Sequence, residues 1–157
     1  MSLWENAVLT AQVRMGLGRY GFIGVPRAKN FAGRVVGDFG VRTPGVDHAA
    51  RSLSGGNLQK FLVGREIDAN PKLLIVSQPT WGVDVGAAAQ IRGELLALRD
   101  AGCAVLVVSE ELEELFEVCD RLYVIAKGRV SPSIARRDAT VQRIGEWMSG
   151  LWEPVHA

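Results

Sequence analysis

Three short, continuous apolar runs constrain the fold of this chain more than any other feature. They occupy residues 73–76, 105–108 and 122–125. Runs of this length predict strands that are buried on both faces of a mainly parallel sheet. A helical pattern over residues 86–100 separates the first two runs, and its apolar stripe consists of Ala88, Ile91, Leu95 and Leu98. Strand, helix and strand at this spacing predict a βαβ unit with a right-handed crossover.

Helical patterns also occur on both sides of this unit. We expect helices over residues 4–15, 26–38, 56–69 and 139–149, and another whose core face carries Leu112, Leu115, Phe116 and Cys119. The final helix would bury Val141, Ile144 and Trp147. Residues 16–24 are rich in glycine, so we expect them to break the first helix as a flexible connection. The fold class is therefore α/β.

Composition narrows the possible functions. A chain of 157 residues with 48% hydrophobic and 22% charged residues is globular and long enough for a substantial core. Its net charge of +1 gives no basic field for nucleic acid. We see no signal peptide and no apolar run near the roughly 20 residues that cross a bilayer, so we expect a soluble, cytoplasmic protein. Cys103 and Cys119 lack metal-ligand spacing, which predicts buried free thiols and no metal site.

A serine and two glycines precede the helix predicted over residues 56–69. Ser54, Gly55 and Gly56 would leave unpaired N–H groups at the positive end of that helix. Because glycine allows an anion to approach the backbone closely, this arrangement suits a phosphate. An ordinary serine-capped helix is the alternative, and for the turn taken alone it is the better interpretation.

The motifs around this turn occur in a family order. Residues 53–60 (LSGGNLQK) resemble the signature of ATP-binding cassette (ABC) proteins, and residues 71–80 resemble the Walker B strand and its exit. Residues 81–86 (WGVDVG) resemble the D-loop of sugar and nucleoside importers. Residues 105–112 occupy the place of the switch-histidine strand, and residues 119–130 resemble the closing hairpin.

This resemblance implies a partial P-loop NTPase fold of the ABC ATPase type, with a mainly parallel sheet flanked by helices and a helical subdomain. Residues 1–69 would be the helical, signature-bearing subdomain, and residues 70–157 the C-terminal part of the RecA-like α/β core. The phosphate-loop part is absent, because no G-x-x-x-x-G-K-[ST] occurs. Residues 16–21 contain glycines but lack the lysine that reaches the β- and γ-phosphates.

Three positions depart from the catalytic pattern of the family. Ser77 and Gln78 stand where the strand would end in Asp-Glu, and Glu110 replaces the switch histidine. Serine is a poor substitute for the carboxylate that holds Mg²⁺, and glutamine has no basic oxygen to polarise water. Glu110 would repel a phosphate. The resemblance therefore implies a degenerate site with no catalytic residue of its own, and we expect the isolated chain to be inactive.

In ABC proteins two nucleotide-binding domains pack head to tail, and each signature covers ATP held by the other domain. The resemblance implies that this chain is the C-terminal portion of a second, degenerate cassette of a sugar or nucleoside importer. The partner's ATP would contact Ser54, Gly55, Gly56 and Asn57. Gln59 and Lys60 would fix the signature helix, and Asp84 of the D-loop would communicate between the sites.

The implied cofactors are ATP and Mg²⁺ in the intact dimer, with neither bound to this chain alone. The implied partners are another nucleotide-binding domain and transmembrane permease subunits, which would hold the protein at the inner face of the membrane; nucleic acid is not expected. Two alternatives remain, a soluble ABC ATPase of the translation or DNA-repair type and a nucleotide-independent α/β interaction domain.

An acidic run follows the second predicted strand. It could be a paired-carboxylate acid–base site, but a solvated helix face is the better interpretation, because apolar side chains fill the opposite side of that helix. Its members are Glu110, Glu111, Glu113, Glu114, Glu117 and Asp120.

Overall fold

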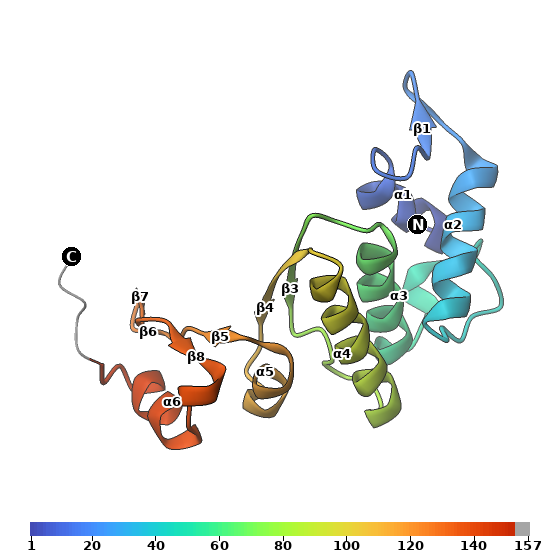
Figure 1. The fold of residues 1–157 in the computed structure, drawn as a ribbon. Helices are drawn as coiled ribbons and strands as arrows, with labels where there is room; N and C mark the ends of the chain where they lie inside the picture. Colours follow the sequence, from blue (N-terminus) through green and yellow to red (C-terminus); the bar gives the residue numbers. More distant parts are fainter. Residues whose placement is uncertain (153–157) are drawn as a thin grey trace. The chain divides into compact units, whose positions relative to one another are not determined.

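The structure, a computed structural model, describes residues 1–152, without the side chain of Arg19, and contains two compact units (Figure 1). The first unit is Met1–Val108 and the second is Ser109–Ala157. The division expected at residues 69 and 70 lies inside the first unit, between its helical part and its strands. That division into family subdomains stays a prediction, and residues 153–157 lie outside the described part.

Three helices build the N-terminal part of the first unit. They are α1 (Leu3–Ala11), α2 (Val25–Asp38) and α3 (Gly55–Asp68), with the short 3-10 helix η1 (Ala50–Ser52) before α3. A capping box starts α1, because Ser2 accepts from the amide of Glu5 while the Glu5 carboxylate accepts from the amide of Ser2. The three helices meet at the largest fully buried side chains, which include Leu3, Phe31, Val35 and Phe61.

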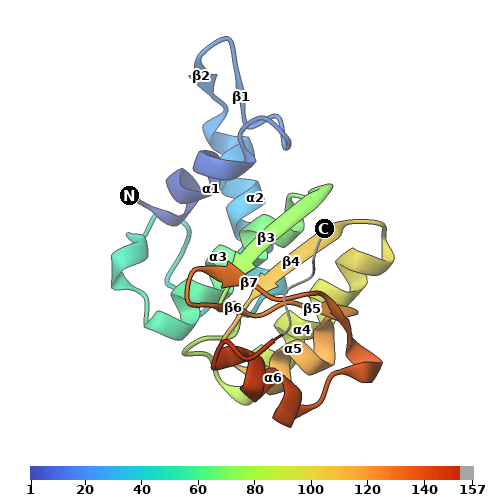
Figure 2. The same ribbon diagram turned by 90° about the vertical axis from the view of Figure 1, so that its left-hand side faces the viewer.

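The glycine-rich connection after α1 is a hairpin, and α1 itself ends earlier than expected. Strands β1 (Gly18–Arg19) and β2 (Phe22–Ile23) pair antiparallel in the register Gly18↔Ile23. Tyr20 and Gly21 both have positive φ, 52° and 84°, as a two-residue type I′ turn requires. The expectation of a flexible connection was therefore wrong, because the turn glycine allows the two short strands to pair (Figure 2).

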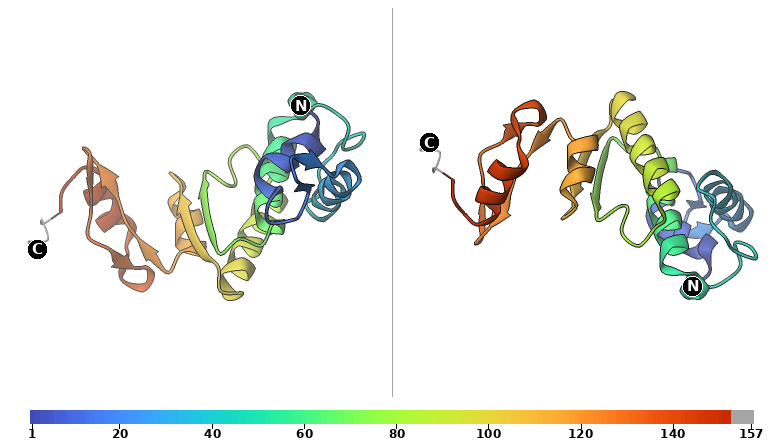
Figure 3. Two further views of the ribbon diagram at one scale, coloured as in Figure 1. Left: turned by 90° about the horizontal axis from the view of Figure 1, so that it is seen from above. Right: turned by 90° about the horizontal axis from the view of Figure 1, so that it is seen from below.

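The βαβ unit is confirmed. Strands β3 (Leu73–Ser77) and β4 (Ala104–Val108) are parallel, with register from Leu73↔Ala104 to Ser77↔Val108, and α4 (Val85–Asp100) connects them. Helices α3 and α4 pack against each other and against the strands, and Figure 3 shows both helices on the same side of β3. On that side Leu74 joins a core with the α4 residues Ile91, Leu95 and Leu98.

Burial of the strands on both faces was expected and is wrong for β3 and β4. Leu73 and Ile75 are 54% and 63% exposed, and Leu106 and Val108 on β4 are also exposed. Their register places these residues on one face of the two-stranded sheet. Because α3 and α4 cover only the other face, the continuous apolar run is half buried within the described residues.

The third apolar run does not join the parallel sheet. It contributes β5 (Arg121–Leu122), which pairs antiparallel with β8 (Ile134–Ala135), and β6 (Ile125–Ala126), which pairs antiparallel with β7 (Arg129–Val130). The expected hairpin is present, because Lys127 and Gly128 adopt the positive φ of a tight turn between β6 and β7. Both short strands from this run pair antiparallel, so the run adds no parallel strand to β3 and β4.

The remaining elements of the second unit are α5 (Leu112–Val118), the 3-10 helix η2 (Arg136–Asp138) and α6 (Val141–Met148). Ile144 and Trp147 of α6 are buried as expected, but Val141 is exposed in the first turn. The acidic face of α5 is only partly solvated, because Glu114 is 4% exposed. The core of the unit comprises Leu122, Val124, Ile134, Ala139, Ile144 and Trp147, with the half-buried Leu112, Leu115 and Phe116 packed against it.

Both cysteines are free thiols. Cys103 is buried, whereas Cys119 is half-buried. Burial raises the pKa of the Cys119 thiol, and the negative charges of Asp120 and Glu114 raise it further, so the thiol stays protonated at neutral pH. Among residues 1–152 no helix is long and apolar enough to span a bilayer.

Candidate functional site

The N-terminus of α3 is open to solvent. Ser54 is its N-cap residue, with φ −62° and ψ 155°, and its Oγ accepts from the Asn57 backbone N–H at 3.5 Å and from Asn57 Nδ2 at 2.9 Å. The Asn57 Oδ1 atom accepts from the backbone N–H of Arg42 at 2.8 Å. Ser54 and Gly55 are exposed. The first amides of the helix therefore face solvent, and a bound anion would satisfy them.

The two glycines of this turn have different surroundings. A Cβ atom on Gly56 would lie 2.8 Å from the carbonyl oxygen of Gly82, whereas a Cβ on Gly55 would meet nothing within 4 Å. Gly56 thus allows α3 to contact the backbone of the turn after β3, and Gly55 keeps an open approach from solvent. A phosphate that approaches the helix at Gly55 would therefore displace no protein atom within 4 Å of that Cβ position.

Gln59 fastens α3 to the end of β3. Its Nε2 atom donates to the carbonyl oxygen of Gln78 at 2.8 Å and to that of Pro79 at 3.1 Å. Gln78 has φ of 50°, uncommon for a residue other than glycine, and its N–H donates to the Val108 carbonyl at 2.8 Å. We call residues 78–84 the strand-exit turn. Gln59 holds two of its carbonyls, so the position of the α3 N-terminus depends on this turn.

Lys60 and Asp84 form a second link between α3 and the strand-exit turn. Lys60 Nζ lies 3.5 Å from Asp84 Oδ2, and Asp84 Oδ1 accepts from the backbone N–H of Ala87 at 2.9 Å as the N-cap of α4. The Ala87 amide, helped by the Lys60 charge, holds the pKa of the Asp84 carboxyl below its usual range. Asp84 is therefore ionised at neutral pH.

The three positions expected to be degenerate belong to two units, Ser77 and Gln78 to the first and Glu110 to the second. Ser77 ends β3 and is exposed, while Gln78 follows it and is half-buried. Glu110 lies at a bend in the second unit and is exposed. Within residues 1–152 no group of three or more His, Cys, Asp or Glu side chains is placed to hold a metal ion. The Gln78 carbonyl accepts from Gln59 Nε2 and from the Trp81 backbone N–H, and the Gln78 N–H donates to the Val108 carbonyl.

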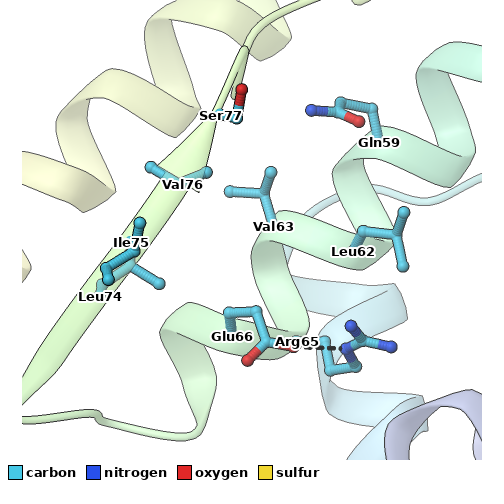
Figure 4. A pocket seen from close by; sticks show the side chains of 9 residues that line it. All are labelled: Gln59, Leu62, Val63, Arg65, Glu66, Leu74, Ile75, Val76 and Ser77. Atoms are coloured by element: carbon cyan, nitrogen blue, oxygen red, sulfur yellow. Dashed lines mark hydrogen bonds and ion pairs between the residues drawn. The ribbon is translucent and has the colours of Figure 1, made fainter. Parts of the chain in front are cut away.

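A shallow hollow of about 220 Å³ lies between α3 and β3 (Figure 4). Arg65 and Glu66 form an ion pair on its rim at 2.8 Å, and Arg65 Nη1 also donates to the Asn6 carbonyl at 2.9 Å. With this arginine already bonded, the hollow is a poor phosphate cradle. Its remaining lining is mostly aliphatic and comprises Gln59, Leu62, Val63, Leu74, Ile75, Val76 and Ser77.

Sequence reasoning placed Gln59 and Lys60 in support of the helix but missed their partners. The i+3 and i+4 spacing of these residues from Gly56 puts all three on one helix face, and that spacing was the available signal. The close approach of Gly56 to Gly82 has no sequence signal, because it joins two segments through the fold.

No family model matches the chain. Among curated proteins it is 43% identical over 150 residues to the nucleoside import ATP-binding protein NupA of Lactococcus lactis, covering 96% of this chain and 30% of that protein. It is 42% identical over 146 residues to the guanosine import ATP-binding protein NupO of Bacillus subtilis, covering 93% and 29%. A ribose import ATP-binding protein RbsA 2 of Rubrobacter xylanophilus is 36% identical over 156 residues, with 99% and 30% covered. The chain thus spans about 30% of the length of these relatives.

Solved structures share the fold. A dimeric bacterial ABC transporter cassette superposes with a TM-score of 0.70 at 21% identity, covering 87% of this chain and 57% of the other. The ATP-binding subunit of another ABC transporter gives a TM-score of 0.72 at 18% identity, covering 95% and 62%.

Proposed function

The chain belongs to the ABC ATPase cassettes and is homologous to part of the import ATP-binding proteins for sugars and nucleosides, and we propose that it completes the ATP site of a partner cassette while its own site is silent. In this proposal it is the C-terminal portion of the second cassette of a sugar or nucleoside importer. The relatives are import proteins by name, which favours this role over a translation, DNA-repair or nucleotide-independent one.

The proposal is carried by two neighbouring features. The N-terminus of α3 is exposed to solvent, and the end of β3 carries no carboxylate. Ser54 and Gly55 are exposed at the start of α3, so a γ-phosphate held by another domain can reach the helix dipole, the Ser54 hydroxyl and the first amides. The Ser54 oxygen already accepts from Asn57 and keeps its own proton to donate to a phosphate. Only on closure of two domains would these groups meet ATP.

The end of β3 supplies the other half of the proposal. Mg²⁺ favours carboxylate and water oxygens, and Ser77 offers only a neutral hydroxyl. Gln78 cannot take a proton from water at neutral pH. In the family's switch position Glu110 would repel a phosphate, by about 4 kcal/mol at about 4 Å and an effective dielectric of about 20. These substitutions support a site in this cassette that binds or hydrolyses ATP poorly.

The strand-exit turn gives the proposed signal route. Gln59 bonds two carbonyls of this turn, and Lys60 pairs with Asp84, which also caps α4. A movement of the turn would therefore displace the start of α3, and with it the groups proposed to face the partner's ATP. ATP and Mg²⁺ would be shared with the partner cassette, and permease subunits would hold the assembly at the inner face of the membrane.

The first test of the proposal is a variant of the full-length importer. Gly55→Asp places a carboxylate where the phosphate would approach, at a position with open space, so the fold is retained. We expect turnover to fall by about 100-fold or more, because the added carboxylate would repel the γ-phosphate by several kcal/mol. Gly33→Asp is the matched control, because Gly33 is exposed on α2 and also has open space around it. Equal transport by both variants would refute the composite site.

A second test uses the purified chain. We expect it to show no ATP hydrolysis above background in the presence of Mg²⁺, because the chain contains no phosphate-loop motif and the strand end lacks both carboxylates. Steady turnover by the chain, lost in Gln78→Asn, would show an active site of its own and contradict the silent role.

A further inference from the structure

The β1–β2 hairpin carries large exposed apolar side chains at the end of the first unit. Tyr20 is 84% exposed and Phe22 is 80% exposed, and Ile23 is also exposed. Figures 1 and 2 show this hairpin projecting away from α1 and α2. We call Tyr20, Phe22 and Ile23 the hairpin tip. The apolar side chains of the tip lie on a projection and fill no pocket. This arrangement differs from that of a single apolar residue that is exposed at the surface.

The base of the hairpin is hydrogen-bonded and partly buried, although its tip is exposed. At its base the Gly24 N–H donates to the Leu17 carbonyl at 2.7 Å, and the Leu17 side chain is 2% exposed. Tyr20 adopts a φ of 52° at the turn, where glycine or asparagine would be less strained. The tyrosine at this turn therefore costs stability relative to glycine or asparagine. Strain of this kind at an exposed position indicates a functional constraint.

The sequence segment that contains the hairpin carries charges of one sign. Residues 6–37 contain five basic residues and no acidic residue, in a chain whose net charge is only +1. Two of these cations pair with carboxylates from elsewhere in the chain, Lys29 with Asp47 at 2.6 Å and Arg34 with Asp68 at 3.0 Å. Arg14 and Arg27 are exposed, and neither belongs to an ion pair within the described residues.

We propose that the hairpin tip and its flanking arginines form a contact site for an anionic phospholipid surface. Exposed aromatic and aliphatic side chains insert at the boundary between headgroups and acyl chains, and neighbouring arginines attract the anionic headgroups. A membrane surface is laterally uniform, so it requires a projecting tip rather than a shaped groove. The proposal does not depend on the nucleotide chemistry, because it uses different residues.

The test is sedimentation of the purified chain with vesicles. Vesicles of phosphatidylcholine with about one quarter phosphatidylglycerol should bind the chain at low salt, and vesicles of phosphatidylcholine alone should bind it more weakly. Binding should weaken in about 0.5 M salt, where the Debye length falls well below its value of about 10 Å at 0.1 M. No binding to anionic vesicles at low salt would overturn the proposal.

Two variants assign the binding to this site. Tyr20→Asn with Phe22→Thr should weaken vesicle binding by about tenfold or more, since two apolar side chains are lost. Asparagine suits the positive φ, so the melting temperature should stay equal or rise. Arg14→Gln with Arg27→Gln should weaken binding by about fivefold for each cation removed.

The matched controls are an exposed apolar residue and an exposed arginine elsewhere. Val141→Ser and Arg51→Gln should leave vesicle binding unchanged. Binding that is equally retained by the Tyr20→Asn, Phe22→Thr variant would overturn the proposal and implicate another surface. Binding to polyglutamate without binding to vesicles would assign the hairpin to an acidic protein segment and would also overturn it.

Discussion

Replacement of Gln59 by leucine tests the link between α3 and the strand-exit turn. Gln59→Leu keeps a side chain of similar size but removes the Nε2 donor, so the carbonyls of Gln78 and Pro79 each lose one hydrogen bond, while the Gln78 carbonyl still accepts from the Trp81 N–H at 3.2 Å. Each such hydrogen bond contributes about 1 kcal/mol net, so the first unit should lose about 2 kcal/mol of stability. Pro79 is fully buried, so water cannot readily replace the lost donor there.

Amide hydrogen exchange measures this loss in the first unit alone. A loss of about 2 kcal/mol corresponds to roughly 30-fold faster exchange of the slowest α3 amides, such as that of the buried Val63. Gln90→Leu is the matched control, because Gln90 Nε2 donates one bond, at 2.7 Å, to the Asp38 carbonyl at an exposed site. Equal effects of the two variants would show that Gln59 does not brace the turn, and the route proposed through it would fail.

Three further comparisons test the site and the core around it. Gly56→Ala should destabilise the first unit in urea and Gly55→Ala should not, because only the former Cβ meets a backbone carbonyl; similar midpoints would contradict the close approach. The pKa of Asp84 is lowered on folding, so its contribution should be present above about pH 4 and vanish as pH falls through the folded pKa. The stability difference between wild type and Asp84→Asn should therefore shrink between pH 7 and pH 3, and a constant difference would argue against an ionised cap. Gly64→Ala should cost about 1–3 kcal/mol by overpacking, since its Cβ would lie 2.5 Å from the Phe39 ring, and an unchanged urea midpoint would refute that packing.

The sequence predicts the helices and strands themselves better than it predicts which of them pair or pack together. The run at residues 73–76 and the stripe on α4 are local signals, and both lead to the observed βαβ unit. The run at residues 122–125 carries the same apolar signal, but a two-residue turn at Lys127 and Gly128 folds it into antiparallel pairs. Its composition could not reveal this outcome, because pairing depends on which strand the turn brings alongside.

In the candidate site, too, local features follow from the sequence and long-range contacts do not. The serine cap of α3 follows from local sequence, and the structure confirms it at Ser54. The bond from Gln59 to Gln78 joins residues 19 apart along the chain, and the approach of Gly56 to Gly82 is likewise set by packing. Glu114 was expected in solvent because apolar side chains fill the opposite side of its helix, but the fold buries it. Contacts between distant segments decide each of these positions.

The most direct measurement asks which cassette of the intact importer holds the hydrolysed nucleotide. Vanadate trapping with a photoreactive ATP analogue would label the cassette whose site turns over. The proposal predicts that label enters the partner cassette alone, and that Gly55→Asp in this cassette abolishes it. Label in the cassette carrying Ser77 and Gln78, or trapping in the partner that Gly55→Asp leaves intact, would contradict the central claim.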